Sequence, residues 1–211
     1  MTPDLVTSLM IPAFTTLFVV IDPIGLTPIF VALTRGASPA ERRGIALRAV
    51  AIAALLLTLF GLVGEAVLGF LGISMSAFRI AGGILLFLTA IDMLFERRAK
   101  RRRDQSEPGL DPAEDPSVFP LATPLIAGPG AIASMILLAG QTGEPLELVA
   151  VMAVMVAVLA VVFVFFLSAA LLEKALSDTG INVLTRLLGM LLAALAVQFV
   201  LDGSADFGFL G

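Results

Sequence analysis

Residues 21–30 read IDPIGLTPIF, and they lie inside an otherwise apolar segment at residues 5–33. A membrane helix needs roughly 20 mostly apolar residues, so this segment is long enough to span a bilayer. Proline removes a helical hydrogen bond and clashes with the preceding turn, and glycine adopts backbone angles that other residues avoid. The stretch therefore predicts a membrane-spanning helix that is broken near its middle.

The composition places the whole chain in the membrane. Of its 211 residues, 59% are apolar and 14% are charged, whereas a soluble domain is about half apolar and about a quarter charged. A folded domain of this size still exposes much of its surface to water, so it cannot hide this much apolar area.

Missing residue types exclude most catalytic chemistry. The chain has no Cys, His, Trp or Tyr, which removes disulfides, thiolate nucleophiles, Cys or His metal sites and imidazole relays. It also lacks an ATP-binding loop of the GxxxxGK type. We therefore expect no enzyme, no metal site and no cofactor; an intramembrane hydrolase would have to rely on Asp22, Asp92 and scattered hydroxyls.

Six apolar stretches are long enough to cross a membrane. They lie at residues 5–33, 45–67, 73–95, 118–139, 148–172 and 183–201.

The basic residues predict the orientation of these spans. Twelve of the 13 basic residues fall in or beside the first, third and fifth connections: Arg35, Arg42, Arg43, Arg48, Arg97, Arg98, Lys100, Arg101, Arg102, Arg103, Lys174 and Arg186. The opposite side carries only acids: Asp4, Glu65, Glu144, Glu147, Asp202 and Asp206. Basic loops stay in the cytoplasm, so both termini are expected outside a bacterial-type cytoplasmic (inner) membrane.

The charged segment at residues 96–117 divides the chain into residues 1–95 and 118–211. It is a basic run followed by an acidic, proline-containing stretch. We interpret the basic run as a topology anchor against anionic lipid, with no nucleic acid as partner, and the remainder as a cytoplasmic linker.

The two halves resemble each other weakly. A shift of 107 residues places Arg79, Gly82, Leu85, Leu88 and Leu94 on Arg186, Gly189, Leu192, Leu195 and Leu201. Three spans per half would insert the second copy upside down, as in many secondary transporters. The predicted fold is therefore all-α, with six transmembrane helices in two inverted three-helix repeats and with helices 1 and 4 discontinuous.

The second predicted break lies at Ala127-Gly128-Pro129-Gly130, in the fourth span. Asp22-Pro23 reads as a helix cap followed by a first-turn proline, and Gly128-Pro129 reads the same way with glycine as the cap. Two half-helix N-termini should then meet near the membrane midplane, where irregular backbone is tolerated only if it is buried or lines a cavity.

These breaks predict a site for a small zwitterion. The Asp22 carboxylate would bind an ammonium group or carry the coupling ion, and the N–H groups near Gly130 and Ala131 would bind a carboxylate. The candidate substrate-binding residues are Asp22, Pro23, Gly25, Thr27, Ala127, Gly128, Pro129, Gly130 and Ala131.

Three further polar residues in the spans are assigned structural roles. Arg79 is expected to reach outward or to pair with Glu65, and Asp92 to reach the cytoplasmic interface. Gln198 is expected to form hydrogen bonds between helices.

Three motifs resemble one known family. These are IDPIGLTPIF at 21–30, FRIAGGILLFLTAIDMLF at 78–95 and PLATPLIAGPGAIASMILL at 120–138. Together they resemble the MarC family of six-helix inner-membrane proteins, also described as the neutral amino acid transporter (NAAT, SnatA-like) family. The family's Asp/Asn-Pro-x-Gly element falls on Asp22, Pro23 and Gly25, and its Ala-Gly-Pro-Gly element falls on residues 127–130.

The resemblance implies an ion-driven transporter of small neutral amino acids such as glycine and alanine. Two alternatives stay open: export of amino acids or other small metabolites, and a non-transporting membrane scaffold or stress protein. The sequence does not distinguish proton from sodium coupling, and a homo-oligomer also stays open. The expected partners are the amino acid substrate and the lipid bilayer.

Overall fold

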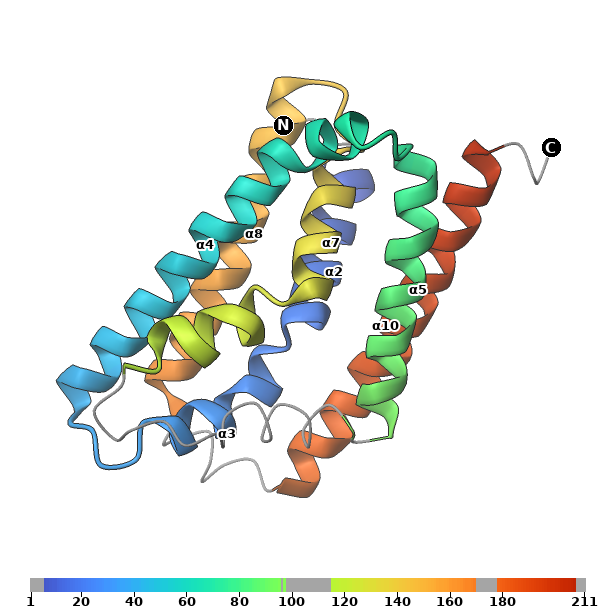
Figure 1. Ribbon diagram of the computed structural model, residues 1–211. Coiled ribbons are helices and arrows are strands. Elements are labelled where there is room, and N and C mark those ends of the chain that lie inside the picture. The colour runs from blue at the N-terminus through green and yellow to red at the C-terminus, as the bar shows by residue number, and fades with distance from the viewer. Residues whose placement is uncertain (1–5, 96, 98–114, 170–177, 208–211) are drawn as a thin grey trace.

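The computed structural model describes residues 6–95, 97, 115–169 and 178–207, and every regular element within these ranges is helical (Figure 1). In chain order the elements are η1 (Val6–Met10), α2 (Ile11–Ile21), α3 (Pro23–Leu33), α4 (Pro39–Phe70), α5 (Met75–Leu94), η2 (Ser117–Ile126), α7 (Pro129–Ala139), α8 (Pro145–Leu167) and α10 (Asp178–Asp206). Most of the linker predicted at 96–117, Lys174 and the end of the fifth predicted span lie outside the described residues.

Within the described ranges, five helices are long and apolar enough to cross a membrane, and a bent pair, η2 with α7, makes a sixth if it is counted as one span. The chain is thus a multi-pass helical membrane protein, with five to six of the predicted spans present. The second span begins earlier than predicted because Ser38 and Glu41 form a reciprocal capping box at Pro39. Its 32 residues measure about 48 Å, so α4 extends beyond a hydrocarbon core of about 30 Å.

The first span forms the centre of the bundle. In its most apolar window 61% of the residues are buried, against 22–39% in the other four spans. Helices α4 and α8 lie on one side of it, and α5 and α10 lie on the other (Figure 1). At the α3–α8 contact, the rings of Phe30 and Phe166 stack with centroids 4.3 Å apart.

The described ends of the chain lie at the same end of the bundle. Helix α2 begins where α10 ends, and the α3–α4 connection lies at the opposite end together with the start of α10 (Figure 1). Arg35 and Arg42 belong to that opposite end, which we call the basic end.

Glycines allow α5 and α10 to pack closely along their length. A Cβ atom on Gly83 would lie 2.8 Å from the carbonyl oxygen of Ala196, and one on Gly189 would lie 2.9 Å from Cβ of Met93. Because rising residue numbers in α5 meet falling numbers in α10, the two helices are antiparallel, as Figure 1 also shows. Small residues at such contacts are typical of helix association in membranes.

The outer surface of the bundle is apolar. Large exposed side chains include Leu55, Leu88, Val149, Val164 and Met190. A soluble monomer rarely exposes so continuous an apolar surface, so these side chains are suited to contact with lipid.

We predict that Gly83→Ala destabilises the protein by about 1–3 kcal/mol, because the added methyl group overlaps the α10 backbone. The matched control is Gly69→Ala in α4, where a Cβ atom would meet nothing within 4 Å. The midpoint of unfolding in a titration with sodium dodecyl sulfate compares the two variants. Equal midpoints would show that the α5–α10 contact is not close.

Candidate functional site

The first span is interrupted at Asp22. Helix α2 ends at Ile21, Asp22 adopts a left-handed backbone with φ of 59°, and α3 begins at Pro23. The Asp22 side chain is 1% exposed and its Oδ1 accepts a hydrogen bond of 3.0 Å from the Gly25 N–H. The predicted cap with a first-turn proline is confirmed at this position.

Gly25 is required by the position of the Asp22 carboxylate. A Cβ atom on Gly25 would lie 2.2 Å from Oδ2 of Asp22, which leaves no room for a side chain. One residue beyond this turn, the buried Thr27 hydroxyl donates to the Pro23 carbonyl oxygen over 2.8 Å. The carboxylate, the glycine and the threonine thus hold the first turn of α3.

The second interruption joins η2 to α7 at an angle of 57°. Gly128 caps α7, Pro129 occupies its first turn, and α7 has no side-chain cap within the described structure. A Cβ atom on Gly128 would lie 2.5 Å from the carbonyl oxygen of Pro124, so the junction admits only glycine. Gly128 as the cap is also confirmed.

The fold brings the two interruptions together. A Cβ atom on Gly130 would lie 3.2 Å from Cγ1 of Val20, in the last turn of α2 before Asp22. Ala127 and Ala131 are buried beside it, whereas Pro129 is exposed. The turn that ends α2 and the turn that starts α7 are therefore neighbours inside the bundle.

Helix α5 contributes residues that the sequence analysis did not assign to the site. A Cβ atom on Gly130 would lie 3.6 Å from Cδ2 of Leu86 and 3.9 Å from the Thr89 hydroxyl oxygen. Thr89 is one hydroxyl residue in an apolar span, so only the packing of α5 against α7 reveals it.

Two of the three polar residues that were assigned structural roles, Arg79 and Gln198, have partners other than those predicted. Arg79 is paired with Asp206 of α10, with Nη1 and Oδ2 2.5 Å apart, rather than with Glu65. Gln198 donates to Asp202 on its own helix over 2.7 Å, so the predicted bond between helices is wrong. Asp92 is half-buried near the end of α5.

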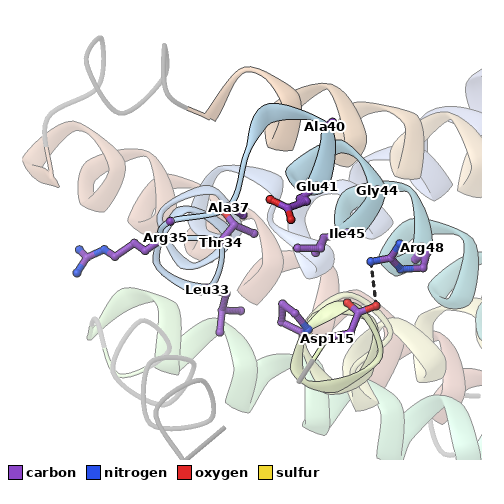
Figure 2. Close-up of a pocket in the computed structure, with 12 residues that line it drawn as sticks. Leu33, Thr34, Arg35, Ala37, Ala40, Glu41, Gly44, Ile45, Arg48 and Asp115 are labelled. Carbon is purple, nitrogen blue, oxygen red and sulfur yellow. Dashed lines mark ion pairs between the residues drawn. The ribbon is translucent and has the colours of Figure 1, made fainter. Parts of the chain in front are cut away.

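A cavity of about 800 Å³ opens at the basic end, between the α3–α4 connection, the first turns of α4 and the residues that precede η2 (Figure 2). Its lining includes Thr34, Glu41, Arg48 and Asp115, and the Arg35 side chain points away from the others in this view. The lining contains none of the residues at the two interruptions.

An ion pair at this cavity joins the first half of the chain to the end of the linker. Nη2 of Arg48 lies 2.9 Å from Oδ2 of Asp115, and Nε of Arg48 donates to the Ser117 hydroxyl over 3.4 Å. Burial raises the pKa of Asp115, but hydrogen bonds from Ser117 and the charge of Arg48 outweigh it and hold that pKa below its usual value. Sequence reasoning assigned Arg48 to topology and Asp115 to the linker, and it missed this pair.

The fold defines a multi-pass helical membrane protein with two interrupted segments in its interior. A family model described as "MarC family integral membrane protein" matches residues 7–207. The chain belongs to the MarC family, as its motifs predicted.

Relatives match over nearly their whole length. A UPF0056 membrane protein of Archaeoglobus fulgidus is 39% identical, over 94% of this chain and 93% of the relative. The UPF0056 inner membrane protein YhgN of Escherichia coli is 35% identical, over 92% of this chain and 95% of the relative. Neither of these names specifies an enzyme activity or a substrate. No solved structure matches the chain.

We predict that Asp22→Ala destabilises the protein by about 2–3 kcal/mol. Alanine removes the cap acceptor, worth about 1 kcal/mol, and puts a residue without local hydrogen bonds into the left-handed region, at about 1–2 kcal/mol. Asp22→Asn keeps both features and should lie within about 0.5 kcal/mol of the parent. Unfolding midpoints in mixed micelles test this, and an equal loss in both variants would assign the stabilisation to the negative charge instead.

Proposed function

We propose that this chain is a secondary active transporter of small neutral amino acids such as glycine and alanine, driven by an ion gradient. The observation that carries the proposal is the close approach of Gly130 to Val20, because it sets the start of α7 beside the end of α2. One side of the site is then the end of α2, which the buried Asp22 carboxylate follows directly in the sequence. The other side is the start of α7, with its first N–H groups. A zwitterion carries the complementary charges.

In this proposal α2–α3 and η2–α7 are the discontinuous helices of two inverted repeats. The antiparallel α5–α10 pair supports the repeat. Gly189 of α10 contacts Ala90 and Met93 of α5, and Gly83 of α5 contacts Ala196 and Val200 of α10. When the first contact is shifted by 107 residues, each of its residues falls on, or one residue from, its counterpart in the second contact. Alternating access would then arise from movement of the repeats about the two interruptions.

The cavity at the basic end is proposed as the cytoplasmic mouth of the pathway. It opens beside α3 and the start of η2, and both elements lead from that end toward the interruptions. Its rim carries charges of both signs, from Arg48 and from Glu41 and Asp115. Such a rim suits the passage of a molecule that carries both charges.

Uptake into liposomes tests the proposal directly. Purified protein is reconstituted, and labelled glycine and alanine are supplied under an imposed proton gradient or sodium gradient. We predict accumulation that requires one of these gradients, and its loss in Gly128→Ala, because a methyl group at residue 128 overlaps the Pro124 carbonyl oxygen. Gly143→Ala is the matched control, since its Cβ atom would lie 3.9 Å from the nearest contact.

The Asp22→Asn variant then tests whether Asp22 carries the coupling ion, separately from its role in the fold. This variant should insert normally but lose the dependence of uptake on the driving gradient. Coupling equal to that of the parent would remove Asp22 as the ion carrier. If the parent protein itself shows no uptake under either gradient, the proposal of amino acid uptake is wrong, and export or a scaffold role takes its place.

The proposed orientation has its own test. Both described ends of the chain lie opposite the basic end (Figure 1), and basic residues favour the cytoplasm. A reporter fused after Gly211 should therefore score as external. A cytoplasmic score would contradict the proposed topology.

A further inference from the structure

The hydroxyl of Ser134, in α7, is buried without a hydrogen-bond partner. Ser134 is 0% exposed, and its Oγ is one of three buried side-chain atoms in the described ranges for which no partner is present. The other two are Nε atoms of arginines. A buried hydroxyl left unpaired loses its hydrogen bonds to water without replacement, so its presence requires an explanation.

Four other hydroxyls in or at the end of the described helices do not share this situation. Those of Thr27, Thr34, Thr89 and Ser204 each donate to the carbonyl oxygen four residues earlier, at 2.7–3.0 Å. The same bond from Ser134 would reach the Gly130 carbonyl oxygen, and it is absent from the described structure. Ser134 therefore keeps a donor available in an apolar interior.

The packing of α7 fixes the direction in which Ser134 points. Gly130, Ser134 and Leu137 are spaced so that they share one face of the helix. At one end of this face Gly130 approaches Val20 and Leu86, and at the other Leu137 Cδ1 lies 2.8 Å from where a Cβ atom of Gly82 would be. Ser134 lies between these contacts, on the face of α7 that packs against α2 and α5.

The hydroxyl also leans toward the start of α7. Side chains on a helix tilt toward its N-terminus and cover the preceding turn. In that turn Gly130 has no side chain, and the first N–H groups of α7 have no partner within the helix. The Ser134 hydroxyl is thus directed to the same turn as these N–H groups.

We propose that Ser134 is a further substrate-binding residue, whose hydroxyl donates to the carboxylate held at the first turn of α7. This inference rests on the proposed transport function and names a residue that the sequence analysis did not assign to the site. Hydroxyl and N–H donors together, at the positive end of a helix dipole, are suited to an anion. Gly130 and the buried Ala127 and Ala131 have small side chains or none, which suits a substrate with a small side chain.

The inference predicts opposite effects on binding and on stability. Ser134→Ala removes a donor to a charged group, so KM for alanine should rise about 10-fold or more with little change in maximal rate. The substrate-free variant should melt at the same temperature as the parent or higher, because it no longer buries an unpaired hydroxyl. Ser204→Ala is the matched control, since the Ser204 hydroxyl is bonded to the Val200 carbonyl in α10, and it should leave KM unchanged.

Competition identifies the group that Ser134 binds. Alaninamide has an amide in place of the carboxylate, so alanine should inhibit uptake of labelled glycine more strongly than alaninamide in the parent protein. In Ser134→Ala the ratio of the inhibition constants of alaninamide and alanine should fall by about the same 10-fold factor. Stabilisation of the protein by added alanine, read from the melting temperature, should weaken in parallel.

The outcomes separate this inference from the function on which it rests. If the parent transports alanine and Ser134→Ala has the same KM and the same advantage of alanine over alaninamide, Ser134 does not bind substrate and the transport function stands. A lower melting temperature and maximal rate with unchanged KM would assign Ser134 a structural role and overturn the inference. If the parent protein does not take up alanine and alanine does not stabilise it, the transport function and this inference are both overturned.

Discussion

Inside a bilayer there is no water to satisfy backbone groups, so a helix that ends there needs another partner for its N–H and carbonyl groups. At the end of α2 this need is met by one carboxylate, because Asp22 accepts the Gly25 N–H and starts α3. The α2–α3 span is the most buried of the five long apolar spans. The helices on both of its sides therefore pack against a segment whose path depends on a single cap.

The two interruptions meet the same constraint with different chemistry. Gly128 is fixed by the close approach of the Pro124 carbonyl oxygen, and it supplies no side chain to cap α7. At the first interruption the Asp22 carboxylate thus accepts the Gly25 N–H, while near the second interruption the Ser134 hydroxyl has no partner in the described structure. The two interruptions therefore differ in polarity: the first carries the Asp22 carboxylate, which is an acceptor, and the second has the Ser134 hydroxyl, which is a donor, nearby.

The sequence predicted the features that depend on local signals. Capping residues and prolines located both interruptions, because a cap is a matter of a few adjacent residues. Partners that lie far apart in the chain were not predicted: Arg79 pairs with Asp206 rather than Glu65, and Arg48 pairs with Asp115. Thr89 and Ser134 also escaped notice, since a hydroxyl in an apolar helix has no distinctive neighbours until the helices are packed.

Those two ion pairs each begin at an arginine of the first half, but they differ in partner and surroundings: Asp206 belongs to the second half and Asp115 to the end of the linker. Arg79 is 14% exposed within the close α5–α10 contact, whereas Arg48 is 53% exposed beside the cavity at the basic end. Exposed pairs contribute only about 0–1 kcal/mol, so the Arg48–Asp115 pair separates at little cost. A glycine-lined helix contact cannot slide without steric clashes. In the proposed transport cycle, movement would therefore begin between α4 and η2 while α5 and α10 move as one unit.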